Sequence, residues 1–232
     1  MPATPSAVLP VLTTILLVGV VAAFASTRSA APSADGAFPA AMPAEPSPVG
    51  VAAASDTAVF AGGCFWGVEA VFETLAGVTD AVSGYAGGSD PTPSYEEVSA
   101  GGTGHAEVVR VVYDPSRISY EQLLQVFFTV AHDPTELNRQ GPDVGTQYRS
   151  AVFYRTPAQR KAAERYIAKL GESKVWPEPV VTEVSALEEF HPAEAYHQDY
   201  LVRHPTQPYI VINDMPKLEE LRKRYPTLVR GG

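Results

Sequence analysis

The chain reads Thr57-Ala58-Val59-Phe60-Ala61-Gly62-Gly63-Cys64-Phe65-Trp66-Gly67 where its globular part begins. A short apolar run followed by two glycines is typical of a strand that ends in a turn. After the turn, large apolar residues recur every three or four positions, as in a helix with one buried face: Phe65, Val68, Phe72 and Leu75. The segment therefore predicts a strand over 57–61 and a helix that begins beside Cys64.

Cys64 is the only cysteine among the 232 residues, which excludes an internal disulfide. In an arbitrary protein a free cysteine is more often a small buried apolar residue than a reactive group. The strand-to-helix junction favours a nucleophile here, because the first N–H groups of a helix stabilise a thiolate. That effect lowers the pKa of a thiol by less than about one unit, so other groups or the substrate must complete the activation.

The N-terminal segment is apolar and uncharged over residues 8–25 and ends in Ala23-Phe24-Ala25, a pattern similar to a secretory cleavage site. No Lys or Arg precedes the apolar run, and about 18 residues can just span a bilayer. We therefore expect residues 1–25 to be a signal peptide or an uncleaved membrane anchor. The protein is expected to be exported, in the periplasm or outside the cell.

The composition divides the remainder of the chain into three parts. Residues 26–55 are rich in Ala, Pro and Ser and predict a flexible linker, because they cannot bury enough apolar surface to fold. Residues 56–226 suffice for one catalytic domain, and 227–232 form a tail. The net charge of −9, without a basic cluster, argues against nucleic-acid binding. We expect a monomer.

The order of apolar runs and turn signals predicts the architecture. Beyond the first strand and helix we expect strands at 78–85, 106–113, 151–154 and 180–184, and helices at 119–130, 157–170 (stopped by Gly171) and 192–202. A long polar loop covers 131–148, and loops of this length inside compact domains are usually functional. The alternation indicates an α+β domain with helices packed on a mixed sheet.

One set of residues combines a nucleophile with an acid and an aromatic wall. Glu107 lies in an otherwise apolar strand, where burial would raise its pKa. With Cys64 and the hydroxyls of Tyr95 and Tyr148, it suits a sulfoxide, whose sulfur becomes electrophilic once its oxygen is protonated or hydrogen-bonded. Phe65 and Trp66 could contact an S-methyl group, although Phe65 could equally belong to the core and both tyrosines could simply cap loops.

Seven motifs together resemble the A-type peptide methionine sulfoxide reductases over about residues 57–204. They are Gly62-Gly63-Cys64-Phe65-Trp66-Gly67, Gly84-Tyr85-Ala86-Gly87-Gly88, Pro93-Ser94-Tyr95-Glu96-Glu97-Val98, Gly102-Thr103-Gly104-His105-Ala106-Glu107, His132-Asp133-Pro134-Thr135, Asn138-Arg139-Gln140-Gly141 and Gly145-Thr146-Gln147-Tyr148-Arg149-Ser150. The resemblance implies a two-layer α+β sandwich with a ferredoxin-like core. It also implies reduction of the S epimer of methionine sulfoxide, free or in proteins, without a metal or a bound cofactor.

The resemblance assigns roles to single residues. Cys64 falls on the nucleophile and Glu107 on the acid, while Tyr95 and Tyr148 fall on donors to the sulfoxide oxygen. Phe65 and Trp66 occupy the positions of the methyl pocket, Asp143 falls on a loop aspartate that organises the site, and Tyr196-His197-Gln198-Asp199-Tyr200 matches a further family motif.

The chain departs from many members of the family because it has no second cysteine near its C-terminus. Attack on the sulfoxide leaves a sulfenic acid on Cys64, which another thiol must reduce. We therefore expect an external reductant, either a thioredoxin- or glutaredoxin-like protein or a small thiol.

Two other functions fit some of the residues. A Cys–His hydrolase would pair Cys64 with His105 or His197. A metal-binding module would use His191, His197 and His204, but their spacings of six and seven lack the compact pairing of zinc sites. Hydrolysis assays and metal analysis separate these alternatives from sulfoxide reduction.

Overall fold

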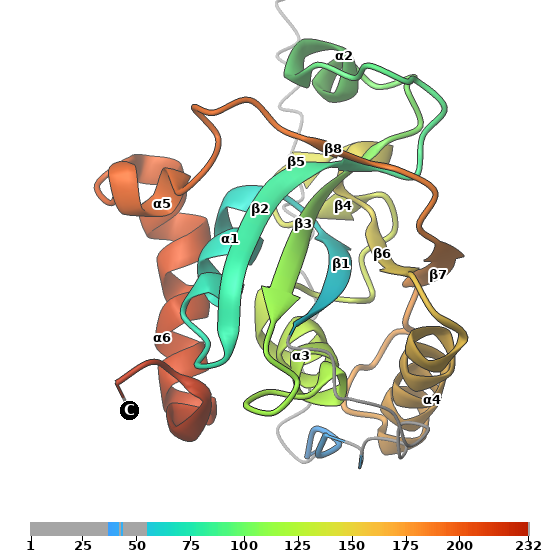
Figure 1. The fold of residues 1–232 in the computed structure, drawn as a ribbon, viewed down its shortest axis with the longest axis vertical. Coiled ribbons are helices and arrows are strands. Elements are labelled where there is room, and N and C mark those ends of the chain that lie inside the picture. The colour runs from blue at the N-terminus through green and yellow to red at the C-terminus, as the bar shows by residue number, and fades with distance from the viewer. Residues whose placement is uncertain (1–36, 42, 44–54, 232) are drawn as a thin grey trace, which may run out of the picture.

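The structure is a computed structural model that describes residues 37–41, 43 and 55–231 (Figure 1). The expected signal peptide or anchor, residues 1–25, and most of the expected linker lie outside the described residues. Within the described part of the chain, no helix combines the length and the apolarity that crossing a bilayer requires.

A six-stranded mixed sheet forms the centre of the domain (Figure 1). Its strands follow one another in the order β7 (Glu183–Ala186), β6 (Ser150–Tyr154), β1 (Asp56–Gly62), β3 (Ala106–Tyr113), β2 (Val78–Ala86) and β8 (Phe190–Pro192). Only the β6–β7 pair in this sheet is parallel. The central order β6-β1-β3-β2, with helices after β1 and β3, is that of a ferredoxin-like split βαβ pair. The expected α+β fold is confirmed.

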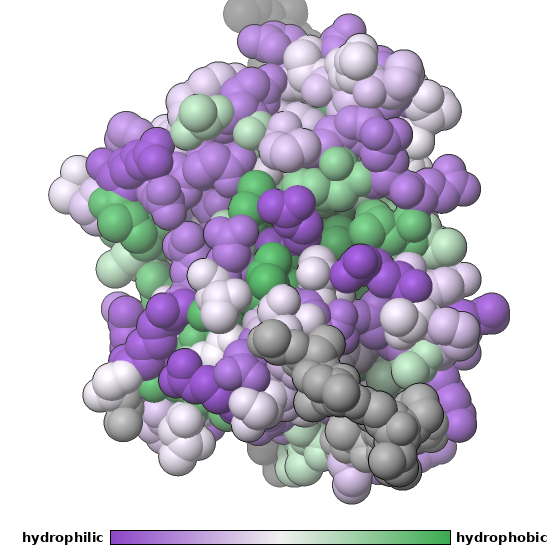
Figure 2. Space-filling model, viewed as in Figure 1, coloured by the Kyte–Doolittle hydropathy of each residue, from purple (hydrophilic) through white to green (hydrophobic). Residues whose placement is uncertain are grey.

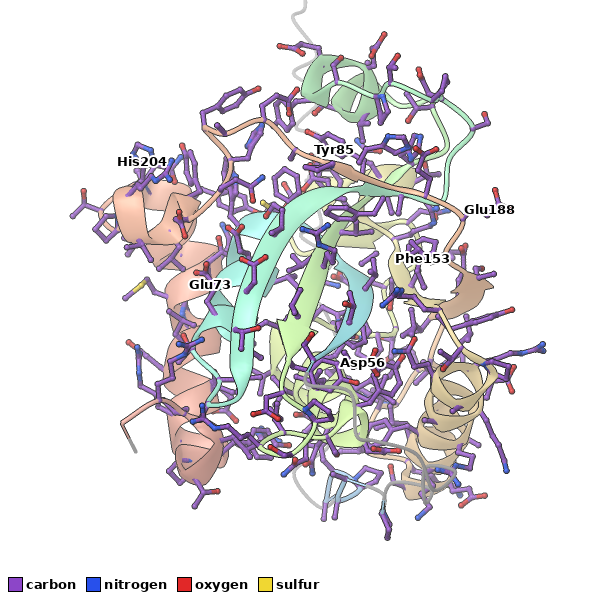
Figure 3. All side chains as sticks on the ribbon, in the orientation of Figure 1. Asp56, Glu73, Tyr85, Phe153, Glu188 and His204 are labelled. Atoms are coloured by element: carbon purple, nitrogen blue, oxygen red, sulfur yellow. The ribbon has the colours of Figure 1, made fainter. Side chains whose placement is uncertain are left out.

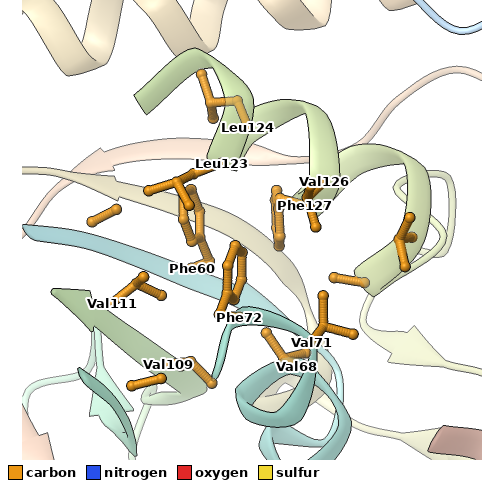
Figure 4. Packing of buried hydrophobic residues seen from close by; sticks show 14 of the residues in the cluster. Phe60, Val68, Val71, Phe72, Val109, Val111, Leu123, Leu124, Val126 and Phe127 are labelled. Carbon is orange, nitrogen blue, oxygen red and sulfur yellow. The ribbon is translucent and has the colours of Figure 1, made fainter. Parts of the chain in front are cut away.

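The larger hydrophobic core lies between the sheet and the helices. The main helices are α1 (Phe65–Glu73), α3 (Tyr120–Val126), which continues as a π-helix at Phe127–Ala131, α4 (Pro157–Ser173) and α6 (Met215–Arg224). Phe60 of β1 stacks on Phe72 of α1 and on Phe127, with ring centroids 5.1 and 4.8 Å apart (Figure 4). These contacts pack α1 and the π-helix against β1, and Cys64 lies between β1 and α1.

The remaining elements are short and lie around the ends of the strands. They are α2 (Tyr95–Ala100), the hairpin β4 (Arg139–Gln140) and β5 (Asp143–Val144), a 3-10 turn at Thr146–Tyr148, α5 (Tyr200–Arg203), a π-helix at Ile210–Asp214 and a 3-10 turn at Pro226–Leu228. The hairpin and the first 3-10 turn give structure to the polar loop that was expected over 131–148. Polar residues cover most of the face shown in Figure 2, with apolar areas between them.

Several expected boundaries are wrong. Gly171 lies inside α4, in open space, and the helix ends instead at Ser173, followed by the C-cap Lys174 with a φ of +52°. The strand expected at 180–184 is β7, three residues later at its start. The helix expected at 192–202 is mostly absent, because β8 pairs with β2 and only four residues of α5 are helical.

The expected tail and one part of the expected linker contact the domain. Within residues 227–231, Val229 forms a β-bridge with Leu75. At the other end of the chain, the half-buried ring of Phe38 packs against Trp176. The described residues of both segments therefore pack against the domain.

Candidate active site

Cys64 lies at the junction between β1 and α1, where it is the N-cap residue of the helix. The turn before it requires glycine at position 63, whose φ is +86° and where a Cβ would lie 2.4 Å from Cβ of Gln140. The Cys64 side chain is 8% exposed, so it is desolvated yet reaches a cavity.

The cavity beside Cys64 has a volume of about 260 Å³. Its lining consists of Cys64, Phe65, Trp66, Tyr95, Glu107, Asp143, Tyr148, Gln207 and Tyr209. All seven residues that the sequence analysis selected therefore meet at one place, although they come from five different elements. The volume suits one side chain rather than a large ligand.

Glu107 is fixed beside the nucleophile by the backbone. Its side chain is 1% exposed, and its Oε2 accepts a hydrogen bond of 3.0 Å from the N–H of Phe65. Burial raises the pKa of the carboxyl to about 8, while the Phe65 amide acts in the opposite direction and the Asp143 charge adds to the increase. Glu107 is therefore largely protonated at neutral pH and can donate a proton.

Burial also raises the pKa of the Cys64 thiol, well above its ordinary value. The negative charges of Glu107, Asp214 and Asp143 add to this effect, and the backbone N–H of Trp66 opposes it. The expected help from the helix terminus is thus smaller than the cost of desolvating a thiolate. At neutral pH the sulfur is therefore a thiol.

The two expected hydroxyl donors come from two short elements that are distant in sequence. Tyr95 is the first residue of α2, and its backbone N–H donates to Oε1 of Glu194 at 2.9 Å. The other oxygen of Glu194 accepts from the hydroxyl of Tyr85, at 2.9 Å. Tyr148 ends the 3-10 turn, and burial raises the pKa of both Tyr95 and Tyr148. Both phenols therefore stay protonated and can donate hydrogen bonds to an oxygen.

Aromatic rings and His197 hold the indole of Trp66 in place. The indole stacks on Tyr200 with centroids 3.8 Å apart, and Nε1 donates to Nδ1 of His197 at 3.1 Å. Phe65 is 1% exposed and also lines the cavity, so it belongs to both the core and the pocket. The indole and the phenyl ring form an apolar wall.

Sequence reasoning missed Gln207 and Tyr209. The hydroxyl of Tyr209 donates to Oδ2 of Asp143, a residue 66 positions earlier in the chain. Burial raises the pKa of Asp143, while Tyr209 and Lys217 lower it. Tyr209 follows Pro208 at the start of a π-helix, and nothing in that local pattern signals a contact with the loop at 143.

The two alternative functions lack their geometry. No histidine is among the residues that line the cavity, and both ring nitrogens of His105 are engaged by Gly88 and Asp90. Within residues 37–41, 43 and 55–231, no three His, Cys, Asp or Glu side chains gather closely enough to hold a metal ion.

Comparisons with known proteins show which family the chain resembles. The family model described as peptide methionine sulfoxide reductase matches residues 56–228. The peptide methionine sulfoxide reductase MsrA 2 of Mesorhizobium japonicum is 54% identical over 174 residues, which cover 75% of this chain and 89% of that protein. The MsrA 2 of Synechocystis sp. is 52% identical over 171 residues, covering 74% and 80% respectively.

Two solved structures are similar in fold. The reduced form of Mxr1 from Saccharomyces cerevisiae has a TM-score of 0.62 at 36% identity, over 67% of this chain and 88% of that one. The methionine sulfoxide reductase A of Corynebacterium diphtheriae has a TM-score of 0.59 at 36% identity, over 67% and 77%.

Proposed function

Because the chain belongs to the A-type peptide methionine sulfoxide reductases, it reduces methionine sulfoxide and thereby repairs oxidised methionine, and we propose that Cys64 and Glu107 carry out this reaction. The assignment rests on the position of these two residues. Both line one cavity, and Glu107 accepts a hydrogen bond from the backbone amide next to the nucleophile. Phe65, Trp66, Tyr95, Tyr148 and Asp143 complete the site.

In the first step the sulfoxide oxygen receives a proton from Glu107 and hydrogen bonds from Tyr95 and Tyr148. The sulfur of Cys64 attacks the sulfoxide sulfur, and its own proton replaces the one that Glu107 gave. This attack forms an S–S bond to the substrate. That bond and the substrate's S–O bond then break as the hydroxyl group passes to the sulfur of Cys64, so that a thiol and a sulfoxide become a sulfenic acid and a thioether. The raised pKa of Glu107, about 8, supports its role as the acid.

The resting site carries no charge at either reacting group. Both the thiol and the carboxyl are protonated at neutral pH, since burial raises both pKa values. A cavity with uncharged reacting groups and an aromatic wall favours a neutral, partly apolar side chain such as methionine sulfoxide. The thiolate forms only when the bound sulfoxide can accept a proton, which protects the lone thiol from unrelated electrophiles.

The second half of the cycle requires an external thiol, because the chain has no other cysteine. One reductant thiol attacks the sulfenic acid and releases water, forming a mixed disulfide with Cys64. A second thiol then releases Cys64 and leaves the reductant as a disulfide. A thioredoxin- or glutaredoxin-like protein supplies both thiols itself, and two molecules of a small thiol serve equally.

The same pocket bears on which epimer of methionine sulfoxide is reduced and on whether the free and protein-bound forms are both substrates. We propose that only the S epimer fits, since the hydroxyl donors and the aromatic wall fix the oxygen and the methyl group on different sides of the sulfur. Free methionine sulfoxide and oxidised proteins both serve as substrates, and the enzyme acts as a monomer. An assay with each epimer and excess dithiol tests this; consumption of both epimers at equal rates would refute it.

The location of the enzyme is a separate proposal. The uncharged apolar run at 8–25 supports export to the periplasm or the cell exterior, with residues 1–25 either removed or kept as a membrane anchor. Mass spectrometry of the mature N-terminus separates cleavage after Ala25 from retention. Full-length protein in the cytosolic fraction would contradict both forms.

A further inference from the structure

The described part of the linker contains the one aromatic residue of residues 26–55. Phe38 is surrounded in sequence by alanines and prolines, which have little to bury. A linker that only spans a distance gains nothing from a large ring exposed to water. The structure places this ring against the domain, where it is half-buried. The described linker residues 37–41, blue in Figure 1, lie beside α3 and α4.

Two side chains of the domain contact the Phe38 ring. Trp176 meets it edge to face, with ring centroids 5.9 Å apart and planes at 65°. The guanidinium of Arg224, on α6, lies 4.6 Å from its centroid in a cation–π contact. Arg224 is itself held by Glu220, whose Oε1 accepts from Nε at 3.0 Å. An aromatic ring and a fixed cation are a specific recognition pair for an aromatic side chain.

The backbone carbonyl of Pro39 also binds to the domain. It accepts hydrogen bonds from the hydroxyl of Tyr166 at 3.0 Å and from Nε2 of Gln125 at 3.2 Å. Tyr166 lies on α4 and is 0% exposed, so its hydroxyl would lose a buried partner if the linker left. Proline fixes the local backbone and has no N–H to satisfy, which suits an extended segment in an aromatic groove.

We propose that Trp176, Tyr166, Gln125 and Arg224 form a built-in docking groove for the Phe38-Pro39 pair of the chain's own linker. The groove lies beside α3 and α4, at the end of the molecule opposite α2, whose first residue lines the active-site cavity (Figure 1). Docking fixes the point at which the N-terminal segment leaves the domain.

The test uses the full chain labelled with 5-fluorotryptophan, because the protein has only two tryptophans and each gives a separate fluorine resonance. In Phe38→Ala, the Trp176 resonance should move and show a larger solvent isotope shift, while the Trp66 resonance stays in place. Pro43→Ala, at an exposed linker position, is the matched control and should leave both resonances unchanged.

A peptide of residues 33–43, added to Phe38→Ala, should return the Trp176 resonance toward its wild-type position, and the same peptide with Ala in place of Phe should not. Methionine sulfoxide reduction by Phe38→Ala should stay within about twofold of wild type, because the groove is remote from Cys64. An unchanged Trp176 resonance in Phe38→Ala would overturn the proposal, as would movement of both resonances.

Discussion

Oε2 of Glu107 accepts a hydrogen bond of 3.0 Å from the backbone N–H of Phe65, the residue that follows Cys64. A main-chain N–H at the start of α1 thus positions the acid next to the nucleophile, although Phe65 and Glu107 are 42 residues apart in the sequence. One carboxylate oxygen is occupied by this bond, so the other is free to carry the proton. The backbone N–H of Phe65 therefore links the acid to the residue next to the nucleophile.

Replacing Glu107 by Gln should lower kcat/KM by about 10²–10⁴-fold, since an amide keeps the hydrogen bond to Phe65 but donates no proton as readily. Wild-type activity should fall as the pH rises through about 8, where Glu107 ionises, and the variant should lack this fall. Steady-state rates between pH 5 and 10 measure both effects.

Glu188→Gln provides a matched control, because Glu188 is an exposed carboxylate away from the cavity (Figure 3). It should keep the wild-type rate and pH profile. Full activity of Glu107→Gln at every pH would show that the proton comes from another group.

Neutralising Asp214 should make Cys64 more acidic. Asp214 is fully buried, pairs with Lys217 at 3.2 Å, and its charge raises the pKa of the thiol. It lies so close to α1 that a Cβ on Gly67 would be 2.0 Å from its Oδ1. In Asp214→Asn the pH profile of Cys64 alkylation should shift to lower pH, with about a tenfold gain in rate for each unit. An unchanged or raised alkylation pKa would contradict this electrostatic account.

Removing the hydroxyl of Tyr209 should weaken substrate positioning through Asp143. Tyr209→Phe deletes the donor to Oδ2 of Asp143, and kcat/KM should fall about tenfold, the size of one hydrogen bond to a charged group. The control variant Tyr154→Phe, on β6, should keep the wild-type kcat/KM because Tyr154 does not line the cavity. Equal losses in both variants, or none in either, would refute a role for the Tyr209–Asp143 pair.

A buried carboxyl outside the cavity should make stability depend on pH. Oε1 of Glu69 accepts a hydrogen bond from the N–H of Ser83, and Oε2 accepts one from the N–H of Asp199. Burial raises the pKa of Glu69 to about 8, and the charge of Glu73, which is labelled in Figure 3, adds to this increase. The unfolded chain ionises near pH 4.5, so unfolding releases a proton between these values. The free energy of unfolding should therefore decrease as the pH rises from about 4.5 to 8.

Glu69→Gln should flatten this decrease in urea denaturation measured at several pH values. His132, whose pKa burial lowers to about 4, acts in the opposite direction between pH 4 and 6.5 in both proteins. A slope in Glu69→Gln as steep as that of wild type would assign the pH dependence to other carboxyls, such as Glu107.

The sequence predicted an element's bounds correctly where a local signal marks them. The bounds of β3 matched because its β-branched run ends at Asp114-Pro115, a local signal. Gly171 did not stop α4, since a glycine with open space around it costs a helix only about 1 kcal/mol. The segment at 190–202 depends on the pairing of β8 with β2, a contact between distant residues that local propensity cannot indicate.

The same distinction applies to the site: residues with a local sequence signal could be predicted, and residues without one could not. Cys64 and Glu107 could be selected because each conflicts with its surroundings, one as a lone thiol at a helix start and the other as a carboxylate in an apolar strand. Tyr209 and Phe38 carry no such local conflict that points to a partner. Their roles arise from contacts with Asp143 and Trp176, which only the folded chain brings near.

The most direct test is a single-turnover experiment without any reductant. Purified protein mixed with an excess of the S epimer should release one methionine per Cys64. Mass spectrometry should show one added oxygen atom on the untrapped Cys64 peptide, and one dimedone adduct on the same peptide after dimedone trapping. Cys64→Ser should release none. Continued turnover without a thiol, or release of methionine with no oxygen on Cys64, would contradict the account.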